Sequence, residues 1–439
     1  MARKAATTRY LLVSGTAALA LTAVAACGSS SKSSSSTTAS SGSAGTTATS
    51  TSSSGSVPAT GKPFIFLYDG DFTSSISVYS QAEVLGLTVA ADQINAAGGI
   101  QGHPIKIEQV NDQSNPTTAV NLLQQKLSSG DTPNAMYPGG DSETTTALLS
   151  TLNRQKILAI DAASASSLND PSKYPYYFGD SELTNGPIPA FLALAKSKGY
   201  KKIAVVYGND VTGQATFQSY QQGLAGSGIS VVGAAYDDTA VDMTPQLEQL
   251  KAQNPDALVV SGYGAPALYI IKSRNQLGWN IPSYADEVAS VFPWTTSLPA
   301  SALTNLYVEE AKELLPANIG DQPAISKLIS DAQAQPGGSK ILAETGVQVV
   351  NVGYNALEIL NFGAQLAHSI SGAAIASALD KTGSPTNVPW VGFGPNDEYG
   401  GMLYTSTNHY PVEDANYYVF VAPGNINSQG LYEAPGASS

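Results

Sequence analysis

The chain has 439 residues, more than the roughly 100–200 residues of one ordinary domain. It carries 21 basic and 34 acidic residues, and loss of the three basic residues before Cys27 would leave 18 basic residues. Such an acidic balance repels phosphate backbones, so nucleic-acid binding is excluded. Cys27 is the single cysteine, which excludes an intrachain disulfide and a cysteine-based metal cluster.

The first 27 residues have the layout of an export signal. Basic residues open the chain, an uncharged apolar stretch covers 10–26, and small residues precede Cys27. The stretch is short for a membrane span, which needs about 20 residues, so we expect a signal peptide over 1–26 that is cleaved. Val24-Ala25-Ala26-Cys27 resembles a bacterial lipobox, which implies lipid on the Cys27 sulfur. The alternative is a cysteine that merely lies near an ordinary cleavage site.

Residues 27–61 form the predicted lipidated cysteine and its linker. From 28 to 60 every position except Lys32, Val57 and Pro58 is Ser, Thr, Gly or Ala, so no apolar face can offset the entropy of ordering. A flexible chain of this length has an r.m.s. reach of roughly 30 Å. We therefore expect an extracytoplasmic protein, anchored by lipid to the outer face of the cytoplasmic membrane.

From Lys62, short aliphatic runs alternate with amphipathic segments, which is typical of βαβ units and a parallel sheet. Gly98-Gly99 end the first helix where a left-handed cap is wanted. The predicted elements are strand 64–68, a helix with apolar residues at 84, 87, 91 and 94, strand 105–110, helix 117–128, strand 135–137, helix 143–154 and strand 157–160.

A second series with the same alternation follows a break at 185–187. Its predicted elements are helix 188–198, strand 203–207, helix 214–225, strand 229–232, helix 244–253, strand 257–260 and helix 266–277. Beyond about residue 305 we expect further helices, notably 346–367, and strands near 389–393, 402–405 and 417–422. The predicted fold class is α/β, with two lobes that each contain a parallel sheet.

Residues 92–105, with the sequence DQINAAGGIQGHPI, resemble the opening helix, turn and strand of the periplasmic binding proteins for leucine, isoleucine and valine. The order of elements matches that family across 62–435. The resemblance implies two Rossmann-like lobes joined by three hinge crossovers, near 180–186, 308–312 and 390–396. It implies a first lobe of 62–183 plus 312–391 and a second lobe of 184–311 plus 392–435.

The loop 138–144 follows a predicted strand and places a glycine turn and a hydroxyl at a helix N-terminus. Free backbone N–H groups there favour an anion such as a carboxylate. The alternative is an ordinary N-cap, in which Asp141 or Ser142 caps the helix. The resemblance favours the first interpretation, because the family holds the ligand α-carboxylate with this loop. Since Asp141 would repel a carboxylate, Ser142 is the predicted contact.

The resemblance assigns six more ligand contacts, five of them as follows. In the loop 161–167, Ala162 and Ser164 match the family's backbone and hydroxyl contacts to the carboxylate. Tyr263 matches its aromatic wall, and Tyr79 lies where the family places a residue beside the ligand. Thr212 stands where several relatives have a tyrosine, which leaves ligand size and side-chain preference open.

Glu287 matches the family's carboxylate for the ligand ammonium. A partly buried carboxylate is costly without a cation. A ligand ammonium would supply that cation through a charge-assisted hydrogen bond. The alternative is a solvated loop acid.

Rival chemistry has weaker support. Residues 262–267 fit the dinucleotide pattern GxGxxA with Asp286 or Glu287 about 20 residues on, yet they follow a late strand and Pro266 suits a helix start. No P-loop or nucleophile elbow is present, and the three histidines lack HExxH spacing. Asp69 and Asp71 could suggest calcium, but no ligand series follows them. We expect no metal, no cofactor and no catalytic residue.

The sequence thus predicts a solute-binding lipoprotein of an ABC importer, not an enzyme. It would be a monomer that captures an amino acid, or a similar small carboxylated or amide solute, by hinge closure and passes it to ABC permease subunits. One alternative is a ligand-sensing receptor module of the same fold without transport. Another is a secreted hydrolase, which would need a nucleophile and a base within hydrogen-bond reach.

Overall fold

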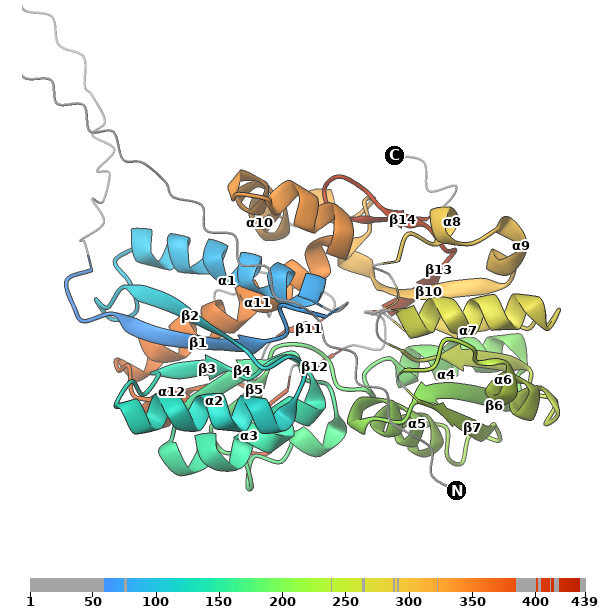
Figure 1. Cartoon of the computed structure of the whole chain (residues 1–439), viewed down its shortest axis with the longest axis horizontal. Helices are drawn as coiled ribbons and strands as arrows, with labels where there is room; N and C mark the ends of the chain where they lie inside the picture. Colours follow the sequence, from blue (N-terminus) through green and yellow to red (C-terminus); the bar gives the residue numbers. More distant parts are fainter. Residues whose placement is uncertain are drawn as a thin grey trace, which may run out of the picture. The chain divides into compact units, whose positions relative to one another are not determined.

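In the computed structural model, the described residues include a sheet of five strands and a sheet of six strands, each with helices on both faces (Figure 1). The described residues are 59–74, 77–237, 239–262, 265–286, 289, 292–321, 323–383, 400–401, 404–410, 412–413 and 418–434. Cys27, Tyr263, Glu287, the predicted strand 389–393 and the crossover near 390–396 lie outside them. We call the elements around the first sheet the first lobe and those around the second sheet the second lobe.

The first sheet has five strands, all parallel, in the order β2-β1-β3-β4-β5. They are β1 (Phe64–Gly70), β2 (Ile105–Asn111), β3 (Ala135–Tyr137), β4 (Leu158–Asp161) and β5 (Tyr177–Gly179). The crossover helices are α1 (Ser77–Ala96), α2 (Pro116–Ser129) and α3 (Ser142–Gln155). The predicted strands of this half are confirmed, whereas β5 was not predicted.

Alternate side chains of β1 pack on opposite faces of this sheet. Phe64 and Phe66 join the core under α1 and α11 (Gly338–Ala367), whereas Leu67 joins the core under α2 and α3 (Figure 1). The period of two therefore makes one short strand the centre of two hydrophobic cores.

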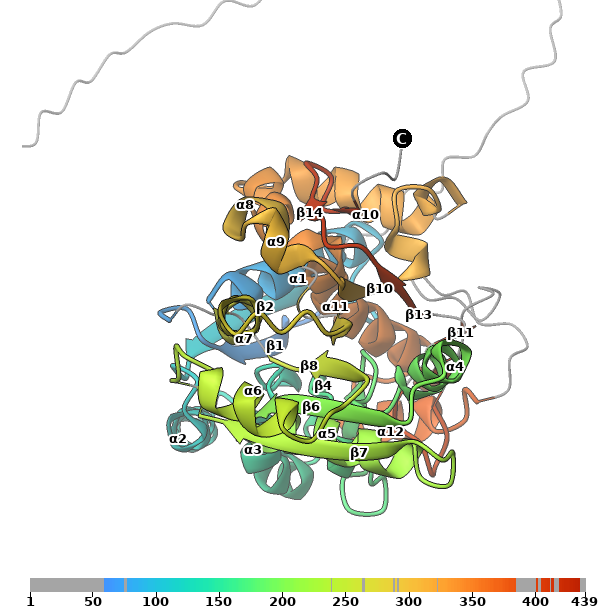
Figure 2. The same cartoon turned by 90° about the vertical axis from the view of Figure 1, so that its right-hand side faces the viewer.

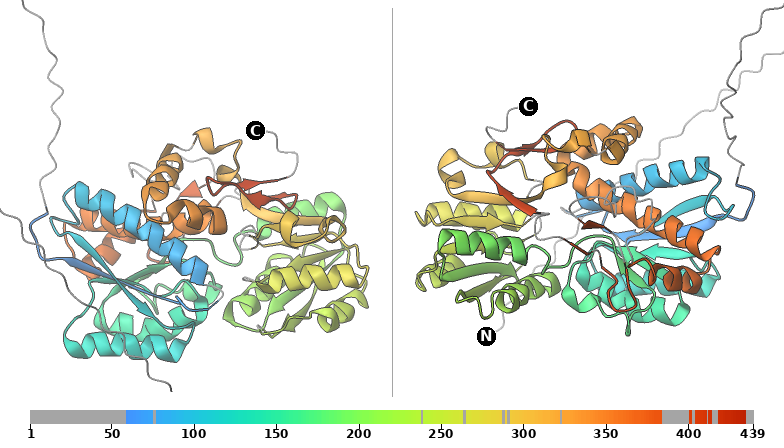
Figure 3. Two further views of the ribbon diagram at one scale, coloured as in Figure 1. Left: turned by 45° about the horizontal axis from the view of Figure 1, so that its top comes forward. Right: turned by 180° about the vertical axis from the view of Figure 1, so that it is seen from behind.

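The helix α11 (Gly338–Ala367) packs along α1 (Figure 3). The two backbones approach closely at glycines: a Cβ on Gly86 would lie 1.9 Å from the carbonyl oxygen of Val350, and one on Gly353 would lie 2.0 Å from that of Glu83. The backbone at Gly346 is not helical, with φ of 79°. The predicted helix 346–367 therefore matches the part of α11 after this break.

The second sheet has six strands in the order β13-β10-β9-β8-β6-β7. They are β6 (Lys202–Gly208), β7 (Ser230–Tyr236), β8 (Ala257–Val260), β9 (Ser283–Ala285), β10 (Leu306–Ala311) and β13 (Tyr418–Val421). The helices α6 (Thr244–Lys251) and α7 (Ala265–Gln276) pack on one face, and α4 (Ile188–Lys198) and α5 (Val211–Gly223) on the other. The sheet is parallel except for β13, which pairs antiparallel with β10 (Figure 2).

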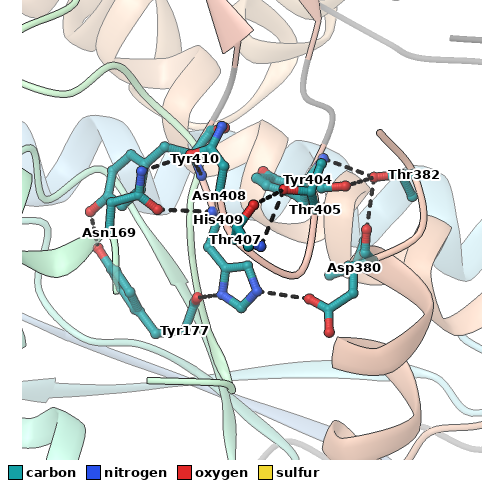
Figure 4. Close-up of polar contacts among 11 residues, drawn as sticks. Asn169, Tyr177, Asp380, Thr382, Tyr404, Thr405, Thr407, Asn408, His409 and Tyr410 are labelled. Carbon is teal, nitrogen blue, oxygen red and sulfur yellow. Dashed lines mark hydrogen bonds and ion pairs between the residues drawn. The ribbon is translucent and has the colours of Figure 1, made fainter. Parts of the chain in front are cut away.

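Residues 404–410 pack on β5 of the first lobe, whereas the predicted boundary at 392 assigns them to the second (Figure 4). The hydroxyl of Tyr404 donates to the carbonyl of Gly179 at 2.8 Å, and the His409 ring stacks on Phe178 at 3.9 Å between centroids. His409 also bonds Asp380, Nε2 to Oδ1, at 2.7 Å. The predicted strand 402–405 is not seen in its described part, where Thr405 makes an isolated bridge to Asn408.

The two remaining crossovers differ slightly from their predicted positions. Residues 180–187 connect β5 to α4 and so lead from the first sheet to the second, as expected. Residues 308–311, however, still belong to β10, so the return to the first lobe begins at Lys312. The helices of that return are α10 (Pro323–Ala334), α11 and α12 (Gly372–Leu379).

Candidate functional site

The two loops predicted to hold a ligand carboxylate lie side by side at the carboxyl ends of β3 and β4. The backbone N–H of Ala165 donates to the Ser142 hydroxyl at 3.1 Å. The N–H of Gly140 donates to Asp161 Oδ2 at 3.3 Å. Because parallel strands end at a common edge, the fold itself brings Ser142 to the loop that contains Ala162 and Ser164.

Asp141, the residue set aside in favour of Ser142, caps α3. Its Oδ1 accepts hydrogen bonds from the backbone N–H groups of Glu143 and Thr144, at 3.1 and 2.8 Å. Ser142 is only 1% exposed. The capping alternative therefore describes this helix end, since Asp141 occupies N–H groups that an anion would use.

The loop around Ala162 and Ser164 is tied to the segment that leads to the second sheet. The carbonyl of Ala162 accepts a hydrogen bond from Ser181 Oγ at 3.0 Å, and that of Ser164 accepts one from the N–H of Thr184 at 2.9 Å. The Thr184 hydroxyl in turn bonds that of Ser219, on α5, at 2.9 Å. Any displacement of this loop is thus coupled to the connecting segment.

The other predicted contacts are spread over both lobes. Tyr79 lies in the first turn of α1, half-buried against the core of the first lobe. Thr212 is on α5 and is 9% exposed. Next to the predicted contacts Tyr263 and Glu287, which are not described, the N–H of Gly262 donates to Asp286 Oδ2 at 3.2 Å, so the loops after β8 and β9 are neighbours.

The sequence analysis missed a set of buried carboxylates at the carboxyl edge of the first sheet. They come from the ends of four strands and from α1, and all are at most 8% exposed: Asp69, Glu83, Asp112, Asp161 and Asp180. The signal that could have found them is positional, because an acid recurs directly at or after the end of each of these strands. Read one at a time, each looks like an ordinary loop acid.

Burial dominates the titration of these groups. The pKa of Asp69 is raised to about 8, mainly by burial and in smaller part by the charges of Asp112 and Asp141. Burial also raises the pKa of Glu83 to about 8, although a hydrogen bond from the Tyr68 hydroxyl, at 2.6 Å, opposes the change. The pKa of Asp180 lies well above its ordinary value because of burial and the nearby charge of Asp161.

Asp161 and Asp71 differ from these acids because hydrogen bonds satisfy them. Asp161 accepts from the hydroxyls of Thr145 and Tyr177, each at 2.6 Å, and burial raises its pKa only to about 6. Asp71 accepts from the N–H groups of Thr73 and Ser74, at 2.7 and 2.9 Å. Asp71 is therefore a turn residue rather than a calcium ligand.

Two further properties bear on the kind of site. Within the described residues, no group of three or more His, Cys, Asp or Glu side chains is arranged to hold a metal ion. Over the same part of the chain, no helix has the length and apolar character to cross a membrane. What the edge does offer is a row of hydrogen-bond acceptors at the ends of parallel strands, where open α/β sheets bind small ligands.

Two α/β lobes with candidate ligand contacts at their strand ends define a binding protein of the periplasmic type. The family model described as "Periplasmic binding protein" matches residues 70–418. The chain therefore belongs to that family, and the curated relatives that it matches include Leu/Ile/Val-binding proteins. It is a solute-binding protein, and its relatives are extracytoplasmic.

Individual relatives are distant. The Leu/Ile/Val/Thr-binding protein of Salmonella typhimurium is 25% identical over 324 residues, which cover 71% of this chain and 81% of the relative. A type 1 periplasmic binding protein from Bordetella pertussis superposes with a TM-score of 0.70 at 17% identity, over 86% of this chain and 98% of that one. A Rhodopseudomonas palustris solute-binding protein in complex with 4-hydroxybenzoate gives 0.67 at 15% identity, over 85% and 96%.

Proposed function

We propose that this protein is the solute-binding lipoprotein of an ABC importer and that it captures an amino acid, or a similar small carboxylated or amide solute, between its lobes. The names of its relatives support this ligand class, because one binds branched-chain amino acids and threonine and another was solved with an aromatic acid. The observation that carries the proposal is the direct bond between Ser142 and the 162–165 loop at the edge where such folds bind ligands.

In this proposal the ligand first binds the first lobe and then recruits the second. Ser142, Ala162, Ser164 and Tyr79 would contact it from the first lobe. The second-lobe contacts would be Thr212, Tyr263 and Glu287. Closure follows because the ligand has more contacts in the closed state than in the open one, and only such a difference in affinity can shift the equilibrium. The permease would then recognise the closed form.

The membrane anchor in this proposal is a lipid on Cys27, attached after cleavage of residues 1–26. A single acyl chain binds membranes only marginally, whereas two or three chains hold a protein stably. Mass spectrometry of the chain expressed in a bacterial host tests this. We expect a diacylglyceryl mass on the N-terminal cysteine and release into the medium of Cys27→Ser. Membrane retention of the variant would argue instead for an uncleaved anchor.

A thermal-shift screen tests the solute class. The mature chain with Cys27→Ser, which carries no lipid, would be heated with each amino acid, short amides, urea and aromatic acids. A ligand that binds the folded state raises the melting temperature by mass action. We expect a shift with at least one carboxylated or amide solute. The proposed ligand class fails if none of these solutes shifts the transition.

A further inference from the structure

Two aspartates at the carboxyl edge of the first sheet are buried without hydrogen bonds. Asp69 is 0% exposed and Asp180 is 1% exposed. Among the described residues, no donor meets the geometry of a hydrogen bond to either carboxylate oxygen of either side chain. The backbone N–H groups of Gly70 and Asp180 lie near enough only to oppose the rise in the pKa of Asp69 and Asp180, respectively, that burial causes. A buried carboxylate that is neither bonded nor paired is one of the most unfavourable groups a fold can contain.

The surroundings of both groups are acidic. Asp69 faces Asp112 and Asp141. Asp180 faces Asp161, Glu83 and Glu182. The ion pairs in the described part of the chain involve Glu108, Asp331, Glu344 and Asp380, and none of them includes these acids. The fold therefore gathers negative charge at this edge and supplies no described cation to balance it.

Structural needs do not account for Asp69 and Asp180. Asp161, which ends the strand between them, is bonded on both oxygens by hydroxyl and backbone donors and so supports the loops around it. Asp69 and Asp180 support nothing in the same way. Asparagine or an apolar residue would serve the fold better at either position, because a partly satisfied polar group is worse than none.

The position of these side chains suggests what they bind. The register places Asp69 at the end of β1 and Asp180 directly after β5, three strands apart in the sheet. At about 4.8 Å between strands, the two carboxylates are separated by roughly 14 Å along the ligand-binding edge. In the second lobe, Asp286 is half-buried, and its inaccessible Oδ1 has no hydrogen-bond partner among the described residues.

We propose that the ligand is a linear cation, such as a basic amino acid or a polyamine, whose protonated nitrogen binds Asp180 and whose chain runs along the row of acids toward Asp69. This inference rests on the proposed solute-binding function but replaces its carboxylated or amide ligand class with linear cations, of which basic amino acids belong to both classes. A charge-assisted hydrogen bond from a guanidinium or ammonium group would satisfy the buried oxygens that the protein leaves unpaired. A neutral branched-chain side chain would leave them unpaired.

Such binding depends on pH in a definite direction. A cation binds the ionised form of the carboxylates. When no cation is bound, these carboxylates repel one another and so hold their protons more tightly. The groups concerned are Asp69, Glu83, Asp161 and Asp180, and the acids that face them are Asp112, Asp141 and Glu182. Cation affinity should therefore rise as the pH increases from about 6 to 8, with proton release on binding. Affinity for a neutral analogue should not rise in this range.

Isothermal titration with matched ligands tests the inference. Arginine and citrulline have the same length but differ in charge, and spermidine and leucine extend the comparison. For the mature Cys27→Ser chain at pH 8, we expect arginine or spermidine to bind at least about thirtyfold more tightly than citrulline. Asp180→Asn should abolish most of that preference without lowering the melting temperature of the free protein.

The control is Asp131→Asn, which removes an exposed acid at the opposite end of the first sheet and should leave binding unchanged. If Asp180→Asn fails to fold, the inference is tested on the protein with Asp180 in place, by comparing how the affinities for arginine and for citrulline change with pH. If citrulline or leucine binds as tightly as arginine or spermidine, the inference of a cationic ligand is wrong, while the proposed solute-binding function stands. Binding of none of the four would also overturn it, while the broader screen above tests solute binding separately.

Discussion

Arg274 and the aspartates of the first lobe bury charge in opposite ways. Arg274, on α7 of the second lobe, is 2% exposed, and its Nη atoms donate to the carbonyls of Ile281, Ala302 and Thr304 and to the hydroxyl of Ser283 at 2.5–3.2 Å, while its Nε has no partner among the described residues. The first lobe buries Asp69 and Asp180 without such partners. A charge satisfied inside the protein is part of the scaffold, whereas a charge left unsatisfied at a ligand-binding edge is available to a ligand.

This contrast separates stability from binding. Loss of Arg274 should destabilise the second lobe, because its partners are carbonyl groups that would remain buried. Replacement of Asp69 or Asp180 should instead stabilise the first lobe when no ligand is bound. The predictions below test the two halves of that statement, from the largest expected effect to the smallest.

The largest effect is expected for Arg274→Met. The substitution keeps an unbranched side chain but leaves up to four buried acceptors without a donor, so we expect the free energy of unfolding to fall by about 3–5 kcal/mol. Chemical denaturation measures this. Arg154→Met, at an exposed position of α3, is the matched control and should change stability by less than about 0.5 kcal/mol. Similar losses in both variants would contradict the scaffold role of Arg274.

A smaller loss is expected for Gly353→Ala, which tests how α11 positions the acidic edge. The added Cβ would lie 2.0 Å from the carbonyl oxygen of Glu83, so α1 and α11 must separate, at a cost of about 2–3 kcal/mol. Because Glu83 belongs to the acidic row, ligand affinity should fall as well. Gly320→Ala, where a Cβ meets nothing within 4 Å, is the control. An unchanged melting temperature for Gly353→Ala would show that the helices can separate freely.

The sequence predicts the parts of this fold that depend on local pattern. The parallel strands such as 64–68 and 203–207, and the helices between them, follow from apolar periodicity and from glycine caps. The strands β5 and β9 were not predicted, because three residues carry no period and neither strand is followed by a glycine turn like Gly139-Gly140, which marks the end of the equally short β3. The packing of residues 404–410 on the first lobe was not predicted, because their partners, among them Gly179, lie more than 200 residues away in the sequence.

The candidate site was only partly predictable for a related reason. The proximity of Ser142 to Ala162 and Ser164 follows from parallel strands that share an edge, and a resemblance supplied the roles. Burial of Asp69 and Asp180 does not follow from any local pattern, since it depends on how α1, α3 and the loops close over them. In the sequence, Asp69 therefore suggested only a calcium site, which was set aside because no further ligands follow it.

Asp69→Asn should stabilise the free protein by about 1–2 kcal/mol near pH 8. Burial raises the pKa of Asp69 to about 8, whereas the unfolded chain titrates near 4. The folded state therefore loses stability through this group as the pH rises from about 4 to 8, and the variant escapes that loss. Thermal unfolding between pH 4 and 8 should show curves that meet at the acidic end. Destabilisation by Asp69→Asn at pH 8 would mean that its carboxylate has a structural partner.

The smallest effect concerns the contact between residues 404–410 and the binding loop. The hydroxyl of Tyr410 donates to the carbonyl of Ala163 at 2.5 Å and bonds the Tyr177 hydroxyl at 2.9 Å, directly behind Ala162 and Ser164. Tyr410→Phe keeps the ring but leaves that carbonyl without this donor, so we expect a loss of about 1 kcal/mol. Because the bond restrains a loop that the ligand is proposed to contact, affinity should fall about three- to tenfold. Tyr174→Phe, a half-buried tyrosine of the same lobe, should change neither quantity. A stability loss with unchanged affinity would place Tyr410 in the scaffold alone, on the same side of the comparison as Arg274.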